Sequence, residues 1–290
     1  MSMKKILVLT DPSENAPDLT QAAAKLANEL HCDVLLFSVY QSIPMTTFYG
    51  ASPWINGNDA SWQQESNDKL SVIAFELRAF ILLSLPGERW RPEVTFHCEA
   101  GDLSDNLKNV LESENIEMIV MGASKQSGFK HFLFGKNTNL VVSNATRPVL
   151  ILPGKFEFKD VQKVLFATDF SVSDLKAVNL LAKYAEALHF DLELVHVEDI
   201  EDKQSEENVS KQVFLNMLED INHPNLTHLE IHGKNVVQSL KRLCSRQGID
   251  MLALLHHQDA LLIRMLKSST TKNILDQQTL PVIVFPSKMK

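Results

Sequence analysis

The sequence contains an internal repeat, and this feature constrains the fold more than any other. Four blocks occur twice, in the same order. They are KILVLTDPS at 5–13 and KVLFATDFS at 163–171, ANELHCD at 27–33 and AEALHFD at 185–191, NIEMIVM at 115–121 and GIDMLAL at 248–254, and RPVLILP at 147–153 and LPVIVFP at 280–286. Chance similarity does not keep four blocks in order. The sequence therefore predicts a duplication, with domains at 1–154 and 160–290 and a short linker between them.

Apolar runs and helical patterns alternate within each copy. Short continuous apolar runs, typical of strands buried on both faces, occur at 6–9, 34–39, 118–121 and 149–152. Between them lie amphipathic patterns, such as 18–30, with Leu19, Ala22, Ala23, Leu26 and Leu30 on one face. Strand–helix alternation with short connections is typical of a parallel sheet covered by helices. We expect each copy to be an α/β domain with a five-stranded parallel sheet between helices.

Each copy ends in a short apolar run, at 149–152 and at 282–285. A strand of this kind would be an exposed sheet edge if it were left alone. The linker is too short to separate the copies widely. We therefore predict that the two edges meet and that the copies pack as a pseudo-twofold dimer within one chain.

The first copy is longer than the second. Asp11 and Asp169 are 158 residues apart, whereas Pro148 and Pro281 are 133 apart, so the first copy carries about 25 extra residues. The insertion falls between Tyr40 and Gly101 and predicts a long loop at 41–66, rich in Gly, Pro, Asn and aromatic residues. Long loops in compact domains are usually functional or mobile. Two interpretations of this loop remain open, a contact surface and a loosely packed cover.

Composition excludes several classes of protein. Among 290 residues, 44% are hydrophobic and 22% charged, which is typical of a folded domain. The formal charge of −8 argues against nucleic acid as the main partner. Cys32, Cys98 and Cys244 form no CxxC pair, so neither a disulfide framework nor a zinc site is predicted. The first residues show no signal-peptide pattern and no apolar run approaches ~18 residues, so we expect a cytoplasmic protein without a membrane span.

Candidate ligand contacts follow the strands, because open parallel sheets bind ligands at the carboxyl ends of their strands. Asp11, Pro12 and Ser13 follow the first run, and Val39 closes the second. The Asp11 carboxylate can accept a hydrogen bond from a ligand. It can equally cap the following helix, as can Ser13, so both interpretations stay open.

A glycine-containing segment, 122–138, follows the fourth run and enters a helical pattern near Asn137. The amino terminus of a helix favours phosphate, and Lys125, Lys130 and Lys136 add positive charge. The spacing is not that of a Walker A loop, because six residues separate Gly128 from Gly135. The alternative is an ordinary turn with solvated lysines.

Together, these residues and the two closing RPVLILP-like blocks resemble the universal stress protein family, over essentially the whole chain and twice. Nucleotide-binding relatives carry glycine, two residues, glycine, nine residues, then glycine followed by Ser or Thr. Here Gly122 and Gly135 match the first and last glycines of this pattern. Lys125 replaces the second glycine, and Lys136 replaces the Ser or Thr. The match is specific for the family and less specific for nucleotide binding.

The resemblance implies a Rossmann-like, adenine nucleotide alpha hydrolase-like fold with strand order 3-2-1-4-5. It also implies ATP or another adenine nucleotide, with Mg²⁺ as its companion ion, with adenine near Asp11 and Val39 and phosphates along 122–138. The implied contacts are Asp11, Pro12, Ser13, Val39, Gly122, Ser124, Lys125, Gly135, Lys136, Asn137 and Thr138.

The second copy has lost the glycine loop. Leu255 stands in place of Gly122, and Ser268-Ser269 in place of Gly135-Lys136. Without glycine the turn cannot easily bring backbone amides close to a phosphate, so we expect nucleotide in the first domain alone. His196, His256 and His257 fall near strand ends, but the supporting carboxylate spacing is missing and no metal site is predicted.

Two classes of function follow. The first is a stress-response regulatory protein that binds an adenine nucleotide in its first domain and acts on a protein partner that the sequence does not identify. The alternative is a nucleotide-independent interaction scaffold that uses the aromatic insertion as its contact surface. Slow ATP hydrolysis is a third, weaker reading, and no catalytic residue is assigned because no acid–base pair commits the chain to chemistry.

Overall fold

The computed structural model of the chain divides into two compact units, Met1–Gly122 and Ala123–Lys290. This division does not follow the repeat, because the last helix and strand of the first copy fall in the second unit. The structure describes residues 3–11, 16–40, 59–85, 90–123, 136–154, 156–198, 205–219, 221, 225–256 and 280–289.

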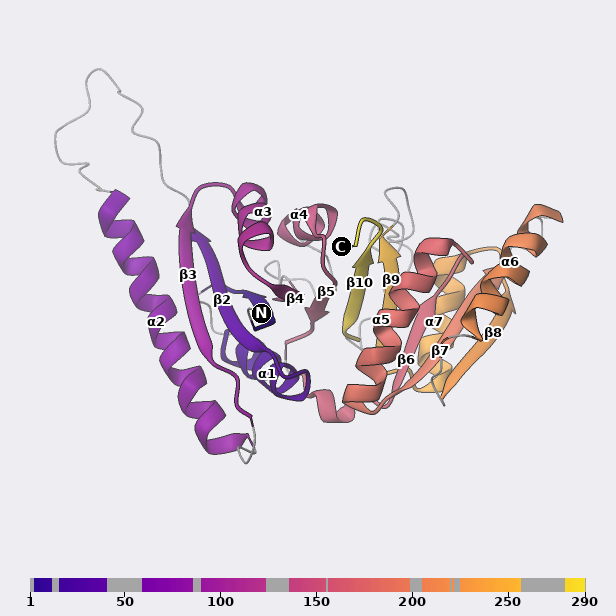
Figure 1. Ribbon diagram of the computed structural model, residues 1–290, viewed down its shortest axis with the longest axis horizontal. Coiled ribbons are helices and arrows are strands. Elements are labelled where there is room, and N and C mark those ends of the chain that lie inside the picture. Colours follow the sequence, from indigo (N-terminus) through magenta and orange to yellow (C-terminus); the bar gives the residue numbers. More distant parts are fainter. Residues whose placement is uncertain are drawn as a thin grey trace, which may run out of the picture. The chain divides into compact units, whose positions relative to one another are not determined.

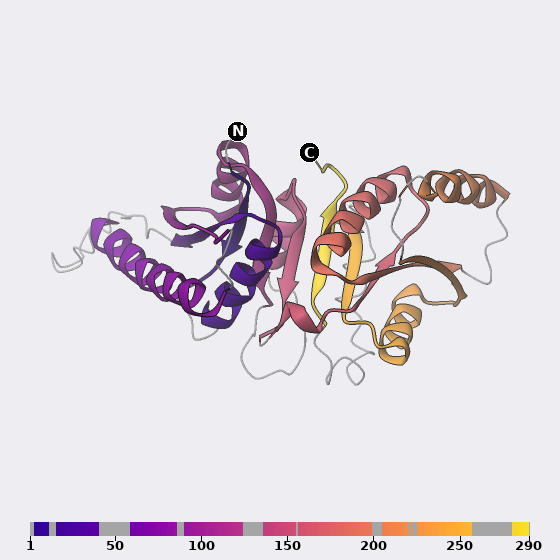
Figure 2. The ribbon, with the colours of Figure 1, turned by 60° about the horizontal axis from the view of Figure 1, so that its bottom comes forward.

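The first unit is a parallel sheet covered by helices on both faces (Figure 1). Its strands lie in the order β3-β2-β1-β4 and all pair in parallel. Helices α1 and α2 lie side by side on one face, and α3 lies on the other (Figures 1 and 2). In chain order the elements are β1 (Lys5–Leu9), α1 (Ala16–Glu29), β2 (Asp33–Tyr40), α2 (Asp59–Ser84), β3 (Val94–Ala100), α3 (Leu103–Ser113) and β4 (Ile116–Gly122).

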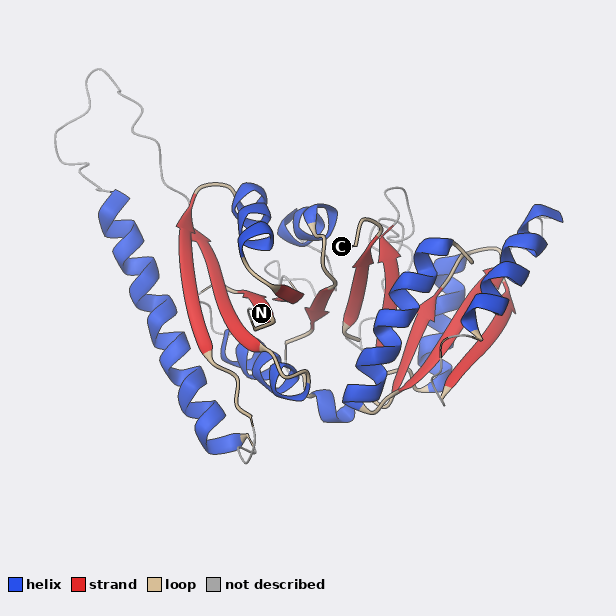
Figure 3. Cartoon of the chain, in the orientation of Figure 1, coloured by secondary structure: helices blue, strands red, loops and turns tan. Residues whose placement is uncertain are grey.

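The second unit contains the complete second copy together with the end of the first. Figure 3 shows its sheet flanked by helices, with α5 and α6 on one face and α7 on the other. In chain order the elements are α4 (Lys136–Asn144), β5 (Val149–Leu152), the 3₁₀ turn η1 (Phe158–Asp160), β6 (Lys163–Ala167), α5 (Val172–Leu188), β7 (Asp191–Glu198), α6 (Ser205–Leu218), β8 (Leu226–His232), α7 (Val236–Gln247), β9 (Met251–His256) and β10 (Val282–Pro286).

The strand order confirms the predicted α/β class. The second copy has the order β8-β7-β6-β9-β10, which is 3-2-1-4-5 when its strands are numbered within the copy. The first unit shows the corresponding 3-2-1-4 part. The strands formed where the continuous apolar runs predicted them, because a strand covered by helices on both faces buries every side chain.

The predicted contact between the two closing strands is confirmed. β5 pairs with β10 in the antiparallel direction, with Val282 opposite Ile151 and Val284 opposite Val149. All four residues of β5 are buried. Neither strand is therefore left as an exposed apolar edge on this side.

The predicted 41–66 loop was too long at its carboxyl end. Residues 59–66 form the first two turns of α2, and residues 41–58 lie outside the described part of the chain. The counterpart helix in the second copy, α6, has 14 residues against 26 in α2. Part of the insertion therefore lengthens a helix.

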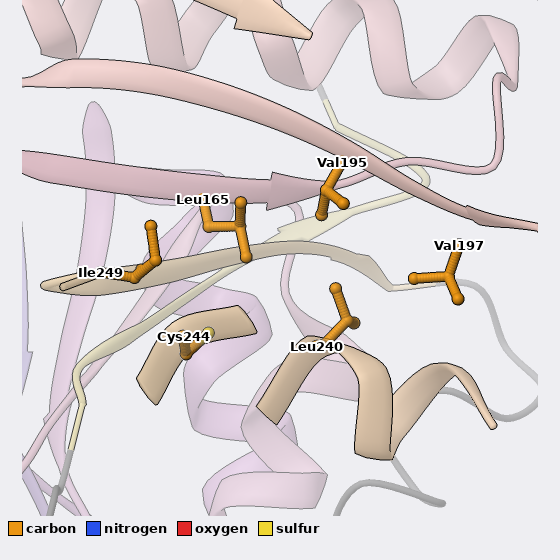
Figure 4. Packing of buried hydrophobic residues seen from close by; sticks show 6 residues of the cluster. All are labelled: Leu165, Val195, Val197, Leu240, Cys244 and Ile249. Carbon is orange, nitrogen blue, oxygen red and sulfur yellow. The ribbon is translucent and has the colours of Figure 1, made fainter. Parts of the chain in front are cut away.

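The core of the second copy illustrates how the sheet and helices are held together. Leu165 of β6 and Val195 and Val197 of β7 pack against Leu240 and Cys244 of α7 (Figure 4). Asn235 caps the amino end of α7, its side chain accepting from the Gln238 amide, and Gly248 ends the helix at a positive φ of 63°. Both ends of α7 are thus fixed by the local sequence while one face is buried.

Among the described residues, no helix combines the length and the apolar composition needed to cross a bilayer.

Candidate functional site

Three predicted site residues lie at one end of the first unit's sheet. The register pairs Leu9 of β1 with Phe37 of β2 and with Met121 of β4. Asp11 and Val39 come two residues after Leu9 and Phe37 along the chain. Gly122 comes one residue after Met121. They therefore lie at the carboxyl ends of three adjacent strands. The strand order reverses at β1, and open α/β sheets bind ligands at such a point.

The turn after β1 keeps Asp11 at the surface. The Thr10 amide donates to the Phe37 carbonyl at 3.1 Å and continues the ladder by one residue. The Thr10 hydroxyl, which is almost fully buried, donates to the Asp11 carbonyl at 3.1 Å. Asp11 itself is exposed. Pro12 and Ser13 lie outside the described residues. The capping role considered for Ser13 therefore stays a prediction.

None of the described residues around Gly122 requires this position to be glycine. A Cβ atom built there would meet Leu19 Cδ2 at 3.8 Å, an ordinary van der Waals contact, and its φ is not in the left-handed region. The glycine therefore relieves no clash and no backbone strain in this turn. A bare backbone at this position does permit close approach of a ligand.

The remaining predicted contacts divide into two groups. Ser124, Lys125 and Gly135 lie outside the described residues. Lys136 is the first residue of α4; Asn137, next in that helix, is exposed, and Thr138 is buried with 1% of its surface accessible. Of the last two, Asn137 alone presents its side chain to solvent.

The corresponding edge of the second copy is constructed differently. Ala167 of β6 pairs with Val195 and with Leu254, so Asp169, Val197 and Leu255 occupy the equivalent strand ends. Leu255 is buried, with 8% of its surface accessible. The position of Gly122 is thus filled by a large apolar side chain in this copy. The Asp169 carboxylate accepts from the Ser171 amide at 3.1 Å and is used within its own turn.

A hydrogen-bonded network fixes the turn between β6 and α5. The buried Asp174 carboxylate accepts from the Thr168 hydroxyl at 2.7 Å and from the Asp169 amide at 3.0 Å. The Thr168 hydroxyl in turn accepts from the Phe170 amide at 3.0 Å. Ser171 caps α5, accepting from the Asp174 amide at 3.2 Å. The first copy has Ala16 where this copy has Asp174, so it cannot form the same network.

Phe170 is the residue that this network orients. Its φ is 62°, which is unusual for a residue other than glycine, and its side chain is buried. The ring stacks on His196 with centroids 4.3 Å apart and meets Phe214 edge-on at 5.4 Å and His228 at 5.8 Å. The sequence alone did not predict this cluster. The available signal was an apolar residue inside a polar turn, four residues before the buried Asp174.

Two histidines of the second copy, His196 and His228, pack against Phe170. His196 Nδ1 lies 2.9 Å from the Thr168 carbonyl oxygen, and its ring covers Phe170. Burial lowers the pKa of His228, against the opposing charge of Glu230. No cluster of three metal-binding side chains occurs in the described ranges. His257 lies outside them.

The cysteines are buried free thiols. Burial raises the pKa of Cys32 and of Cys244 to about 11. A thiol reacts as its thiolate, so neither residue is suited to nucleophilic chemistry at neutral pH.

A duplicated α/β domain with strand order 3-2-1-4-5 defines the class as a tandem Rossmann-like protein. Within that class, the model of the universal stress protein family matches residues 3–153 and again 160–286. The chain belongs to the universal stress protein family.

Individual relatives are similar over one copy or over both. Universal stress protein MJ0531 of Methanocaldococcus jannaschii is 23% identical over 151 residues, which is 51% of this chain and 81% of that protein. The crystal structure of a universal stress protein from Archaeoglobus fulgidus has a TM-score of 0.70 at 17% identity and covers 99% of this chain and 100% of its own. A functionally unknown protein, PA1789 of Pseudomonas aeruginosa, has a TM-score of 0.62 at 15% identity, with 99% and 94% covered. At these identities the two structures support the fold alone.

Proposed function

We propose that the chain is a stress-response regulatory protein that binds ATP or a related adenine nucleotide through its first copy, in the cytoplasm. The observation that carries this proposal is the edge formed by Asp11, Val39 and Gly122. These residues stand at the point where the strand order reverses, with an exposed carboxylate on one side and a bare backbone on the other.

The residues present fit such a ligand in chemical terms. The Asp11 carboxylate can accept from a ribose hydroxyl or an adenine amine, and Val39 offers its half-buried backbone and side chain to a base. Phosphate contacts from Ser124, Lys125, Gly135, Lys136 and Asn137, and a bound Mg²⁺, remain predictions from the sequence. A bound nucleotide would bring a charged, hydrogen-bonding group to this edge of the sheet. Its binding can therefore signal that the nucleotide is available.

The second copy supports binding at one site per chain. Leu255 fills the place of Gly122, and the Asp169 carboxylate is engaged by the Ser171 amide. A ligand there would have to displace a buried leucine and break the hydrogen bond between Ser171 and Asp169, whereas the first copy has Gly122 in place of that leucine. We therefore assign the nucleotide to the first copy alone.

The test is ATP binding by wild type, Gly122→Ala and Asp11→Ala. Gly122→Ala should leave the thermal unfolding midpoint unchanged or slightly raised, because its Cβ fits beside Leu19. It should weaken ATP by about tenfold or more if the nucleotide approaches the backbone, and Asp11→Ala should do the same by removing a charged hydrogen bond. Wild-type affinity in both variants would overturn the site, and absence of ATP binding by wild type would overturn the function.

A second candidate function is the nucleotide-independent interaction scaffold. The observation that favours it is the apolar outer surface of α2, where Phe75 is 71% and Leu83 is 86% exposed. Identification of small molecules released from the purified protein separates the two candidates. An adenine nucleotide supports the first. A protein that purifies empty and gives no heat on titration with ATP supports the second.

A further inference from the structure

Helix α2 is apolar on two faces. Its inner face carries Leu70, Ala74, Leu77 and Ile81, each at most 3% exposed. This face packs against α1, β2 and β3. The spacing of four, three and four residues is that of an ordinary amphipathic helix on a core, and it leaves the other apolar side chains of the helix to be explained.

The outer face of α2 is formed by a second stripe: Val72, Phe75, Leu82 and Leu83, which are 54%, 71%, 61% and 86% exposed. Between Leu70 and Leu83 the charged residues are Glu76 and Arg78, and the Arg78 side chain donates to the Val94 carbonyl of β3 at 2.6 Å. A helix that is apolar all round is normally buried all round. The outer stripe therefore needs an occupant.

The spacing of the outer stripe indicates that the occupant is a helix. Val72, Phe75, Ala79 and Leu82 follow one another at intervals of three, four and three residues, the a and d positions of two heptads. Side chains in that pattern insert between the side chains of a neighbouring helix that is nearly aligned with their own. A flat surface or an extended peptide would not require this periodicity.

We propose that this outer stripe (Val72, Phe75, Ala79, Leu82 and Leu83) pairs with the same stripe of a second copy of the chain, the two α2 helices running antiparallel about a twofold axis. In this arrangement Phe75 of each chain lies over the small Ala79 of the other, and Val72 lies opposite Leu82. Large side chains thus meet small ones in every layer. A parallel pair would instead place Phe75 against Phe75 and leave the alanines facing each other.

The surface available is sufficient for a stable dimer. The four exposed side chains leave on the order of 500 Å² of apolar surface per chain, with roughly 150–250 Å² for a fully exposed large side chain. Two chains would bury about 1,000 Å² of apolar surface, and ordinary interfaces are about 57% apolar. The complete interface then falls within the range of about 1,200–2,000 Å² that specific complexes bury. An interface of one surface with itself closes as a dimer and does not extend to fibres.

This association is independent of nucleotide binding, and its test is the mass of the full chain in solution. Sedimentation of wild type over a range of concentrations should give a dimer. Phe75→Glu should raise the dissociation constant by about thirtyfold or more, because it places a charge at the centre of the interface. Val172→Glu is the matched control: Val172 is 68% exposed on α5, and this variant should dimerise like wild type.

A disulfide test distinguishes the orientation. Phe75→Cys chains mixed with Ala79→Cys chains should form a mixed disulfide on oxidation, whereas Ala79→Cys alone should not cross-link. The native thiols are buried and should not interfere. Circular dichroism confirms that each variant is folded. A wild type that stays monomeric at all concentrations, or a dimer that Phe75→Glu leaves intact, would overturn the proposal.

Discussion

The Asp174 carboxylate is 1% exposed, and its hydrogen bonds fix the turn before α5. Burial raises its pKa to about 6 from an ordinary value of 3.8; the hydrogen bond from Thr168 opposes this rise and the charge of Asp169 adds to it. The folded protein therefore holds this proton more tightly than the unfolded chain does. Protonation of Asp174 stabilises the fold below about pH 4, and this contribution is lost as the pH rises through 6.

The Asp174→Asn variant tests this titration. The amide oxygen can accept the same two hydrogen bonds, from the Thr168 hydroxyl and the Asp169 amide, without ever ionising. In urea titrations, the free energy of unfolding of wild type relative to the variant should fall by roughly 3 kcal/mol between pH 4 and pH 7, at about 1.4 kcal/mol per pKa unit. A difference that stays constant over this range would show that Asp174 titrates normally.

Among the elements, α5 has a buried and an exposed face that carry the same residue type. Val178 is 0% exposed, and Val172, at the start of the helix, is 68% exposed. Packing energy depends on the apolar surface removed from water. The two valines therefore separate the effect of burial from that of helix propensity.

We expect Val178→Ala to lower the free energy of unfolding by roughly 1.5–3 kcal/mol, from lost burial and the cavity left behind. Val172→Ala should change it by less than about 0.5 kcal/mol. Thermal or chemical unfolding of the two variants measures both values. Equal losses would indicate that α5 does not bury the face that the structure assigns to it.

The strands with continuous apolar runs were predictable, because strands covered on both faces bury most of their side chains, and the repeat gave these predictions a second sequence. β3 and β8 have no such run and are only partly buried. Helix α2 was predicted less well. Its first two turns, DASWQQES at 59–66, have no apolar periodicity and read as loop. The Phe170 cluster could not be predicted, because it depends on side chains from β7, α6 and β8 that only the folded chain brings together.

The sequence predicts where several candidate site residues lie in the fold, and their contact with a ligand stays a prediction. Asp11, Val39 and Gly122 could be placed at one edge because the carboxyl ends of parallel strands lie on the same side of a sheet. The predicted contacts from Ser124, Lys125 and Gly135 lie outside the described residues and stay predictions. Gly122 as a ligand contact stays a prediction, and its packing adds one fact that the sequence could not: no described neighbour requires it to be glycine.

For the whole molecule, the two copies have one topology and different strand ends. The first copy combines an exposed Asp11 with a bare Gly122, whereas the second combines an engaged Asp169 with a buried Leu255. The two copies therefore differ at the positions that we propose contact a nucleotide. We therefore propose one nucleotide site per chain, located in the first copy.

Calorimetric titration of ATP into the full chain tests this claim most directly. We predict a stoichiometry close to one per chain, an affinity about tenfold weaker in Asp11→Ala, and wild-type binding in the matched second-copy variant Asp169→Ala. Folding of both variants is checked by circular dichroism. Two equivalent sites per chain, or a single site that Asp169→Ala removes and Asp11→Ala preserves, would contradict the account.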